Sequence, residues 1–522
     1  MKNNKKTTTK TVVFVMLIMI LSRLLGFIRE IIMTNKFGIG VETDAFFAAF
    51  TIPDMMYYLL IGGALSSAFI PVFTSYLSKG DEEEAWKVAS TFINITVLLL
   101  MVLSILGITF AQYLVPLVAH KFQGEQLDLT IELTRFMFPA VTFTALAGLE
   151  TGVLNSYKIF NAPSIGPILY NFGIIYGTIF LTSRFGIRGM AIGVVIGAIS
   201  NALYQFIFVS KKAKHYRFTF DLNHPGVKKI FKLIVPAMIG LSVTQINLVV
   251  NQNIASAFDK GSITALRLAN RIMQLPLGIF AMSISTVIFP TITAQIAKGE
   301  ISDFRDTFAM GMRNIFFVTI PSAVGLMTLG VPLIRLLFVR GAFNEDDAMV
   351  TATILVFYTL GLAFQGGVQL LTRGFYANHD TKTPVKISFM AMFGNIILSL
   401  LLAYYTPLKV NGLALAYSIT SFVNMTMLFK TLGKKMDGIN SKEIVSSFFK
   451  STIASIVMGV VIVILNVIFN KYFDVNDKTI QIIQVTVDTL IGAGVFFVVA
   501  NILNMQEVND IKEIIKRKRS RR

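Results

Sequence analysis

Long apolar runs alternate with short polar segments along the whole chain, and this alternation is its dominant pattern. A run of about 20 apolar residues is long enough to cross roughly 30 Å of hydrocarbon as an α-helix. Hydropathy predicts about fourteen such spans, so we expect an all-α polytopic membrane protein. The expected limits are residues 11–33, 41–75, 87–115, 128–156, 163–183, 187–210, 227–256, 263–295, 306–329, 346–376, 383–405, 410–430, 443–469 and 479–503.

The composition also favours a membrane protein over a soluble one. Of 522 residues, 54% are hydrophobic and 15% are charged, and the mean hydropathy is +0.67. An ordinary soluble domain has about 25% charged residues. The chain contains no cysteine, which excludes disulfides, thiolate chemistry and cysteine-ligated metals.

Basic residues gather at the two ends of the chain and in alternate loops. They are concentrated in residues 2–10, 211–229, 430–442 and 512–522, whereas the intervening loops hold few. Because cytoplasmic loops carry an excess of Lys and Arg, both termini are expected in the cytoplasm. The same rule accounts for the net charge of +18, so we expect no nucleic-acid partner.

Two segments in opposite halves of the chain are similar to each other. Residues 69–74 read FIPVFT and residues 288–293 read IFPTIT, at an offset of about 219. Further matches between residues 189–212 and 412–435 have an offset of about 223. Six spans separate the copies, so both halves enter the membrane with the same polarity, as in two-lobed transporters. Chance similarity between apolar helices is the alternative.

This repeat predicts a domain organisation. We expect two six-helix lobes in parallel pseudo-repeat, at residues 1–215 and 216–435. Residues 436–522 lie outside the repeat and are expected to form two further membrane helices and a basic cytoplasmic tail.

The stretch over residues 22–71 places charges inside apolar surroundings. A charge near the centre of a bilayer costs a few kcal/mol or more, so it needs a partner, water or a ligand. In the first span Arg23 and Glu30 share one helical face, and Arg29 lies on another. In the alternative interpretation, Arg29 and Glu30 lie near the outer interface and Arg23 pairs with Asp44 or Glu30.

The eighth expected span carries Arg267 and Arg271, one helical turn apart on one face. Like charges at this spacing repel each other. Guanidinium groups bind phosphate oxygens in bidentate fashion, so a diphosphate would fit this pair. A structural acid such as Glu150 is the alternative partner. Glu150 could also bind a cation or a proton, or pair with Arg135, and Asp488 is expected to be structural or interfacial.

The chain lacks three sequence motifs that mark common classes of enzyme. It has no HExxH helix, no phosphate-binding GxxxxGK[ST] loop and no GxSxG motif. We therefore expect a protein that is not an enzyme and that uses no cofactor and no bound metal.

The charged stretch and several later motifs resemble the MurJ (MviN) family of lipid II flippases, within the multidrug/oligosaccharidyl-lipid/polysaccharide exporter superfamily. The resemblance covers about the first 430 residues. It implies fourteen helices in two six-helix lobes, a cationic cavity, and outward transfer of the lipid-linked peptidoglycan precursor. It also implies a groove for the undecaprenyl tail on the last two helices. The matching segments are residues 22–71, 269–272, 341–343, 374–376 and 382–386.

By this resemblance Arg23, Arg29 and Arg271 would be cavity arginines, and Asp44 would lie at a functional position of the family. Arg267 and Glu30 complete the expected substrate-binding set, which is then Arg23, Arg29, Arg271, Arg267, Asp44 and Glu30.

The chain departs from the family pattern at several positions. Where members commonly have a basic pair and a Glu-Gly-Ala in the second span, this chain has Tyr57-Tyr58 and Gly62-Gly63-Ala64. Acidic residues that hold a cation in some members correspond to Asn251 and Ser399 here. These neutral residues put a sodium site of that kind in doubt and leave the membrane potential as an energy source.

The resemblance predicts a multi-pass protein of the bacterial plasma membrane. Its expected partners are lipid II, an undecaprenyl-diphosphate-linked muropeptide, and the surrounding membrane lipids. We expect a monomer that works beside the cell-wall synthesis machinery. Two alternatives stay open. One is a flippase for another polyprenyl-diphosphate glycan, or a drug/cation antiporter of the same superfamily; the other is a membrane scaffold whose basic tail binds anionic lipids.

Overall fold

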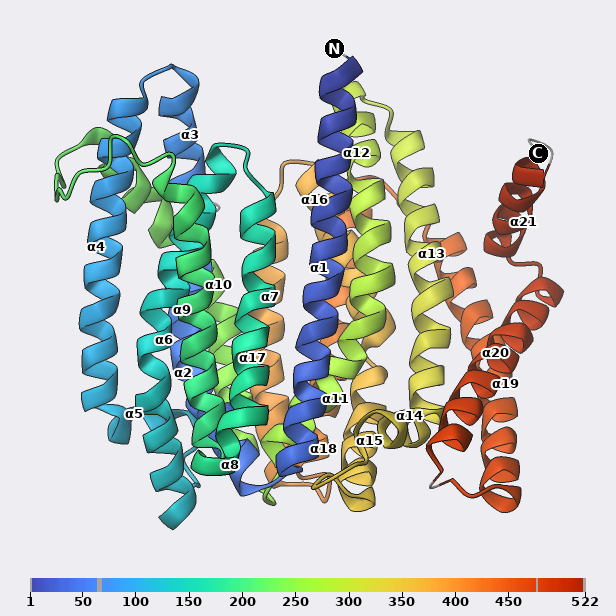
Figure 1. The fold of residues 1–522 in the computed structure, drawn as a ribbon. Coiled ribbons are helices and arrows are strands. Elements are labelled where there is room, and N and C mark those ends of the chain that lie inside the picture. Colours follow the sequence, from blue (N-terminus) through green and yellow to red (C-terminus); the bar gives the residue numbers. More distant parts are fainter. Residues whose placement is uncertain (1, 63–67, 476, 520–522) are drawn as a thin grey trace. The chain divides into compact units, whose positions relative to one another are not determined.

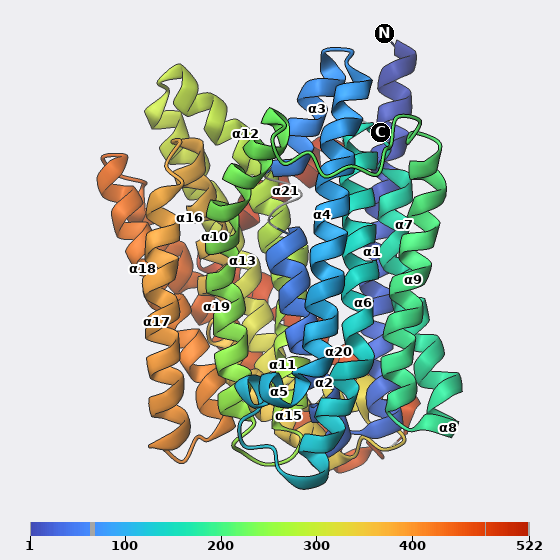
Figure 2. The ribbon, with the colours of Figure 1, turned by 90° about the vertical axis from the view of Figure 1, so that its left-hand side faces the viewer.

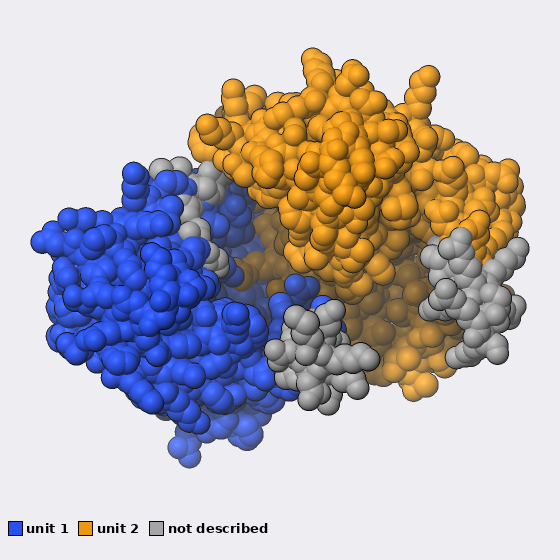
Figure 3. Space-filling view, turned by 90° about the horizontal axis from the view of Figure 1, so that it is seen from above, with its two compact units in different colours: residues 1–264, 341–343 blue, residues 265–340, 344–522 orange. Residues whose placement is uncertain are grey.

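The computed structural model describes residues 2–62, 68–475 and 477–519, and the regular structure in them is helical (Figure 1). The chain forms two compact units. Unit 1 comprises residues 1–264 together with the short segment 341–343, and unit 2 comprises residues 265–340 and 344–522 (Figure 3). The lobe limits expected from the repeat, 1–215, 216–435 and 436–522, stay a prediction.

Unit 1 contains the helices of the first half of the chain, most of which lie roughly alongside one another (Figures 1 and 2). They are α1 (Lys2–Phe37), α2 (Val41–Tyr57), the π-helical segment η1 (Tyr58–Gly62), α3 (Ile70–Ser78), α4 (Glu82–Thr109), α5 (Ala111–Val118), α6 (Gly124–Ser156), α7 (Asn161–Tyr176), the π-helical segment η3 (Gly177–Leu181), α8 (Thr182–Phe185), α9 (Arg188–Ser210) and α10 (Pro225–Ala255).

Glycines bring α7 and its π-helical continuation close to α9 in unit 1. A Cβ atom on Gly173 would lie 2.3 Å from the Cα of Gly197, and one on Gly177 would lie 2.6 Å from the Cα of Gly193. Larger residues could not occupy these positions without moving the helices apart. Small residues at helix interfaces are typical of membrane proteins, in which close backbone packing supplies much of the attraction. This packing fixes α7, which carries one of the polar residues described below.

Unit 2 contains the remaining helices. They are α11 (Ser262–Pro276), whose first three residues belong to unit 1, the π-helical segment η4 (Leu277–Ala281), α12 (Met282–Lys298), α13 (Ile301–Thr328), α14 (Gly330–Phe338), α15 (Glu345–Thr359), α16 (Leu362–Ala377), α17 (Lys382–Tyr404), α18 (Val410–Lys435), α19 (Ser441–Tyr472), α20 (Lys478–Ile502) and α21 (Gln506–Arg519).

The secondary structure repeats between the two halves at the offset expected from the sequence. The π-helical segments η1 and η4 begin at Tyr58 and Leu277, about 219 positions apart. Helices α4 and α13, which follow them, are both 28 residues long and start at the same offset. A π-helical turn within a longer helix is uncommon and often marks a functional site. Two such turns at equivalent positions favour a true repeat over chance similarity.

Most expected spans coincide with observed helices to within a few residues. Ten described helices are long and apolar enough to cross a membrane, and the pair α15 and α16 adds an eleventh if it counts as one span. These two helices are bent by 44° where the sequence predicted one span over residues 346–376. The structure is thus that of a multi-pass helical membrane protein, and the expected number of fourteen is consistent with it.

Candidate substrate-binding site

The charged end of α1 is held against α7 within unit 1. Arg29 Nη2 donates to Glu30 Oε1 at 2.7 Å, and Arg29 Nη1 donates to Asn171 Oδ1 on α7 at 3.2 Å. Asn171 is itself oriented by a bond from its Nδ2 to the carbonyl oxygen of Pro167 at 2.9 Å. The Arg29 side chain is 21% exposed and the Glu30 side chain 10%. Arg29 is therefore a fixed, largely buried cation with part of its guanidinium accessible.

Two further groups act on this guanidinium through space. Asp54 on α2 and Tyr170 on α7 both interact electrostatically with Arg29. The cation is thus compensated by acids from its own helix and from a neighbouring one. An anionic ligand that approached Arg29 would compete with these acids, since a buried charge without a partner is strongly unfavourable.

Arg23, six positions earlier on α1, has different surroundings. It is exposed, and the structure gives it no hydrogen bond or ion pair with the described residues. The alternative in which Arg23 pairs with Asp44 or Glu30 is wrong for this conformation, because both acids have other partners. The Arg23 side chain is therefore a cation on the exposed surface of α1.

Asp44 is a buried anchor between α2 and the start of α11. Its carboxylate accepts hydrogen bonds from Gly261 N at 2.7 Å, from Thr264 N at 2.8 Å and from Thr264 Oγ1 at 2.7 Å. The residue is 2% exposed. An acidic side chain at this position satisfies the free N–H groups of the first helical turn and complements the positive end of the helix dipole. In this conformation the carboxylate of Asp44 orients α11.

A second link within unit 1 joins α1 to the segment at residues 341–343. The amide of Ala342 donates to the carbonyl oxygen of Asn35 at 2.8 Å. Gly341 has a φ of 61°, and a Cβ atom there would lie 2.1 Å from Asn35 Oδ1. Both the backbone angle and the close approach thus require glycine, which explains one motif of the resemblance.

In unit 2, Arg267 and Arg271 lie one turn apart on α11, and both side chains are exposed. The neighbouring Asn270 bonds with Tyr358 on α15, which fixes the helix against its own unit. For Arg271 the structure gives no hydrogen bond or ion pair with the described residues. The arrangement expected from the sequence, two adjacent arginines on one helical face, is present.

Sequence reasoning missed two polar residues of these helices. Asn171, the acceptor for Arg29, is an uncharged residue inside an apolar span, so the pattern of charges in the sequence does not identify it. Arg373 on α16 donates to Thr286 Oγ1 at 3.3 Å and lies 5.4 Å above the ring of Phe289. Because it is an arginine within the expected span 346–376, the cost of charge in lipid could have identified it.

Glu150 does not form the ion pair that was considered for it. It is 4% exposed on α6, and neither carboxylate oxygen has a hydrogen-bond partner. Arg135 instead donates to the carbonyl oxygen of Ile108 at 3.2 Å. The interpretation of Glu150 as a structural partner of Arg135 is therefore wrong, because the two residues are 15 positions apart on one continuous helix, roughly 22 Å along its axis.

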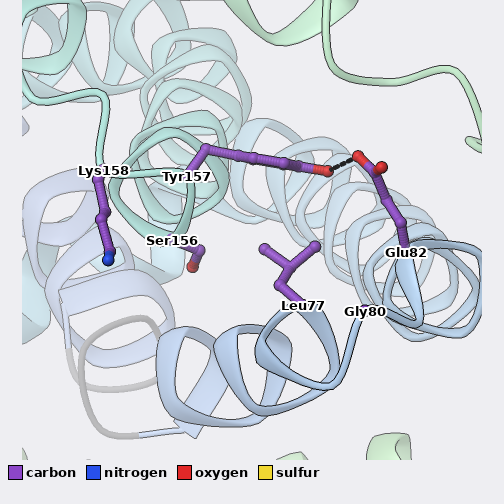
Figure 4. Close-up of a pocket in the computed structure, with 6 residues that line it drawn as sticks. All are labelled: Leu77, Gly80, Glu82, Ser156, Tyr157 and Lys158. Atoms are coloured by element: carbon purple, nitrogen blue, oxygen red, sulfur yellow. Dashed lines mark hydrogen bonds between the residues drawn. The ribbon is translucent and has the colours of Figure 1, made fainter.

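None of the expected site residues lines either of two open pockets formed by described residues within the units. The first, of about 310 Å³, lies at the ends of α3, α4 and α6 in unit 1 (Figure 4). There Tyr157 donates to Glu82 Oε1 at 2.5 Å and accepts from Trp86 Nε1 at 2.9 Å. The second, of about 520 Å³, lies between α13 and α21. Neither resembles a site for a large anionic ligand.

The chain matches the family model "Lipid II flippase MurJ" over residues 33–483. It is 32% identical over 507 residues to a probable lipid II flippase MurJ of Buchnera aphidicola subsp. Acyrthosiphon pisum, covering 96% of this chain and 98% of that protein. It is 31% identical over 426 residues to the lipid II flippase MurJ of Burkholderia cenocepacia, covering 80% and 82% of the two chains.

Solved structures agree with this relationship. The structure of a lipid II flippase MurJ in an inward closed conformation matches with a TM-score of 0.79 and 30% identity, over 95% of this chain and all of that chain. An inward-facing multidrug MATE transporter of the MOP superfamily matches with a TM-score of 0.68 and 14% identity over 82% of this chain, which shows a shared fold alone. The match to the family model and the similarity to these relatives over most of the chain show that it belongs to the MurJ family of lipid II flippases.

Proposed function

We propose that this chain moves lipid II from the inner to the outer leaflet of the bacterial plasma membrane by alternating access. The observation that carries this proposal is the similarity to lipid II flippases along 96% of the chain. The physical support is the presence of arginines in membrane helices of both units, Arg29 in unit 1 and Arg271 in unit 2. A diphosphate head group cannot cross hydrocarbon unaided, and guanidinium groups offset the loss of its hydration.

Arg29 and Glu30 give this proposal a concrete exchange of partners. Without substrate, Glu30 compensates the guanidinium at 2.7 Å, and Asn171 fixes its direction. When lipid II binds, its diphosphate replaces Glu30 as the anion on Arg29. Since an arginine carries five N–H donors in a planar fork, it can hold Asn171 and a phosphate oxygen together.

Arg271 and Arg267 supply the second contact in this scheme. Their mutual repulsion on one face of α11 is relieved when an anion binds both. Asp44 acts indirectly, as a positioning residue that holds the first turn of α11 through Gly261 and Thr264. Arg23 completes the set as a cation at which the head group first arrives.

The remaining features of the proposal concern the whole protein. We place both termini in the cytoplasm because the basic residues cluster at the termini and in alternate loops. We place the lobe limits at residues 1–215 and 216–435, with 436–522 as an appendix. The protein acts as a monomer next to the enzymes that consume lipid II.

Transport in reconstituted vesicles tests the proposal directly. The purified protein is placed in vesicles that contain labelled lipid II, or a polyprenyl diphosphate that carries a different sugar, and the labelled head group reaching the opposite leaflet is measured. We expect transport of lipid II above that of the other lipids. Preferential movement of another polyprenyl diphosphate glycan would assign the protein to a different substrate, and no movement of any would reject a flippase.

A further inference from the structure

The hairpin of α19 and α20 is coloured orange to red in Figure 1. It contains a row of buried polar side chains that the proposed substrate site does not use. Gln481, Gln484 and Asp488 are 2%, 1% and 0% exposed. Positions i, i+3 and i+7 lie on one helical face, so the three side chains form a line along α20. We call this line, together with Asn466 of α19, the polar seam.

The first part of the seam begins at Lys478, where α20 starts. Lys478 Nζ donates to Gln481 Oε1 at 3.1 Å and to the carbonyl oxygen of Val339 at 2.8 Å. Gln481 Nε2 in turn donates to the carbonyl oxygen of Val475 at 2.8 Å. Lys478 is exposed, so this end of the seam meets the surroundings of the protein.

One turn further along α20, the seam joins the two helices of the hairpin. Gln484 Nε2 donates to Asn466 Oδ1 at 2.9 Å, and Asn466 Nδ2 donates to the carbonyl oxygen of Thr328 on α13 at 3.1 Å. Each of these amides is therefore satisfied by a protein partner, which is what a low-dielectric interior requires of buried polar groups.

Asp488, the next residue of the seam, breaks this rule. It is completely buried, and neither carboxylate oxygen has a hydrogen-bond partner in the described structure. Of the two expected positions for Asp488, structural or interfacial, this burial contradicts the interfacial one. An ionised carboxylate that is buried without a partner costs far more free energy than a neutral carboxylic acid. Binding a proton removes the negative charge of the Asp488 carboxylate and is the simplest way to avoid this cost.

Among the described residues, no charged group on a neighbouring helix forms a hydrogen bond with the Asp488 carboxylate. Where the structure shows a partner for a charged residue next to α20, that partner is another residue than Asp488. Arg335 pairs with Glu345 at 2.9 Å, and Arg313 pairs with Glu443 at 2.9 Å. Glu507 accepts from Ser447 at 2.6 Å. The described ionisable residues on the elements packed against α20 are Lys442, Glu443, Lys450, Lys471 and Tyr472 on α19, Asp303, Arg305, Asp306 and Arg313 on α13, Arg335 on α14, and Glu507, Asp510, Lys512 and Glu513 on α21.

Asp488 follows Gln484 by one turn on the same face of α20, and an apolar side chain lies beyond it. Gly492 follows Asp488 by one turn, and Ile462 of α19 fills the space beside it, so that a Cβ atom there would lie 2.8 Å from Ile462 Cδ1. Beyond this apolar layer the hydroxyls of Ser455 and Ser451 are buried without partners. A proton can therefore approach Asp488 along the amides from the Lys478 end, and the layer of Ile462 separates it from the opposite end.

We propose that Asp488 is a proton-binding site of the α19–α20 hairpin, which water at the Lys478 end loads and unloads along the polar seam. The ligand is a proton rather than a metal ion, because hard cations take on the order of six oxygen ligands and Asp488 offers a single carboxylate. Protonation forms one O–H bond on the carboxylate, and its release returns the proton to water at the same end.

Infrared spectroscopy of the full-length protein in vesicles tests the site without any transport assay. A protonated carboxyl absorbs as a carbonyl stretch separate from that of a carboxylate. We expect the spectrum of the wild type minus that of Asp488→Asn to show this band at neutral pH and to lose it at alkaline pH. Asparagine has the shape of the protonated acid, so the variant should fold. A carboxylate band at neutral pH, or a band that persists at all pH values, would overturn the proposal.

A matched variant separates Asp488 from Glu150, another buried acid whose carboxylate has no hydrogen-bond partner in the described structure. Glu150→Gln removes the carboxyl of α6 and leaves the hairpin unchanged. The band assigned to Asp488 should stay in the spectrum of Glu150→Gln and disappear in that of Asp488→Asn. The assignment fails if Glu150→Gln removes the same band.

The route is tested by hydrogen exchange. In D₂O the carboxyl band shifts as the proton is replaced, and Gln484→Leu, which interrupts the seam, should slow this shift several-fold. Ser451→Ala is the control, because Ser451 is equally buried but lies beyond the Ile462 layer, and it should leave the rate unchanged. Exchange at the wild-type rate in Gln484→Leu would overturn the assigned route.

A coupling of this proton to transport rests on the proposed function. In vesicles, Asp488→Asn should move lipid II at a rate that no longer depends on pH, whereas the wild-type rate depends on it. If the wild type does not move lipid II at all, the proposed function fails while the infrared result stands. If both proteins show the same pH dependence, the site exists but is not coupled, and that part of the inference is rejected.

Discussion

The arginines of the two units differ in how they are compensated. Arg29 already has an acid and an amide at hydrogen-bond distance, whereas Arg271 is exposed on its helix. A compensated cation can be buried at moderate cost, but an anionic ligand must then displace the compensating acid. An exposed cation has no such competition. The residue-scale predictions therefore concern the charge of Arg271 and the orientation of Arg29.

Replacing Arg271 by alanine should abolish growth of cells depleted of their own lipid II flippase, at an unchanged level of the protein. The residue is exposed, so its loss removes an anion contact and leaves the core intact. Arg271→Lys should restore growth in part, because lysine keeps the charge and loses the bidentate fork. Arg188→Ala, which removes an exposed arginine paired with Glu132, is the control and should support growth. Full growth with Arg271→Ala would reject the site.

Asn171→Ala should reduce lipid II transport by roughly tenfold. The change removes the acceptor of Arg29 Nη1, and a hydrogen bond to a charged group contributes about 1.5–3 kcal/mol. The transport rate per folded protein in vesicles is the measurement. Asn201→Ala breaks an amide pair with Gln205 in the same unit and serves as the matched control. Equal losses in both variants would mean that packing, and not Arg29, is responsible.

At the scale of elements, two acidic residues fix a helix start and a loop. The sequence shows where these acids lie along the chain, but it does not show which groups they bind. Asp44 lies at the start of α2 and binds the first turn of α11, 220 positions away in the chain. Asp380 lies in the loop between α16 and α17 and binds the end of α18. Both connections tie together helices that are distant in sequence, so each carries a stability prediction.

Asp44→Ala should lower the free energy of unfolding by about 1–3 kcal/mol or more, because it leaves buried N–H groups of Gly261 and Thr264 without acceptors. The midpoint of thermal unfolding in detergent reports the loss. Glu42→Ala, two positions earlier on the exposed side of α2, should leave the midpoint unchanged. If both variants unfold like the wild type, the link between α2 and α11 does not stabilise the fold.

Asp380 should make the stability of unit 2 depend on acid. Lys435 donates to its carboxylate at 2.6 Å, and this bond with two from Thr383 lowers the pKa of Asp380 below its ordinary value. The folded-state pKa is thus below the unfolded one, so the stabilisation is present at neutral pH and is lost as the pH falls below the ordinary aspartate range.

Thermal unfolding of the wild type and of Asp380→Asn over that acidic range measures this contribution. Asp380→Asn should be less stable at neutral pH, and the difference should shrink as the pH falls. Because Lys435 is partly exposed, we expect a modest effect that decreases in high salt. A constant difference at every pH would mean that the carboxylate charge is not involved.

At the scale of the whole molecule, the sequence repeat predicts two halves that enter the membrane with the same polarity. The equivalent π-helical segments and the equal lengths of α4 and α13 support this relation. The orientation that we propose for the membrane rests on the distribution of basic residues, which is a property of the sequence. The absence of cysteine makes this orientation directly measurable, since any introduced thiol is the sole one in the chain.

Lys214→Cys and Lys121→Cys should react from opposite sides of the membrane. Both lysines are exposed, one in the connection after α9 and the other before α6. A membrane-impermeant maleimide added to intact cells should label Lys121→Cys, and Lys214→Cys should become reactive when the cells are permeabilised. The reverse pattern would invert the proposed topology, and with it the direction in which the termini point.

The sequence by itself determined the helices, the repeat and the identity of the charged residues in them. Span length and hydropathy are local properties, and the structure confirms most span limits to within a few residues. The family could be recognised for the same reason, because its motifs are short and contiguous. Hydropathy did not predict the bend between α15 and α16, since the apolar composition continues through it.

Tertiary structure alone decided which polar groups meet. Arg29 bonds to Asn171 at a separation of 142 positions, and Asp44 to Thr264 at 220. Arg135 binds the carbonyl oxygen of Ile108 on α4, and Glu150 has no hydrogen-bond partner in the described structure. A helical period says which residues share a face, but the partner of that face depends on how helices pack. Hydrogen bonds between distant helices, and the buried acids left without them, therefore had to be read from the fold.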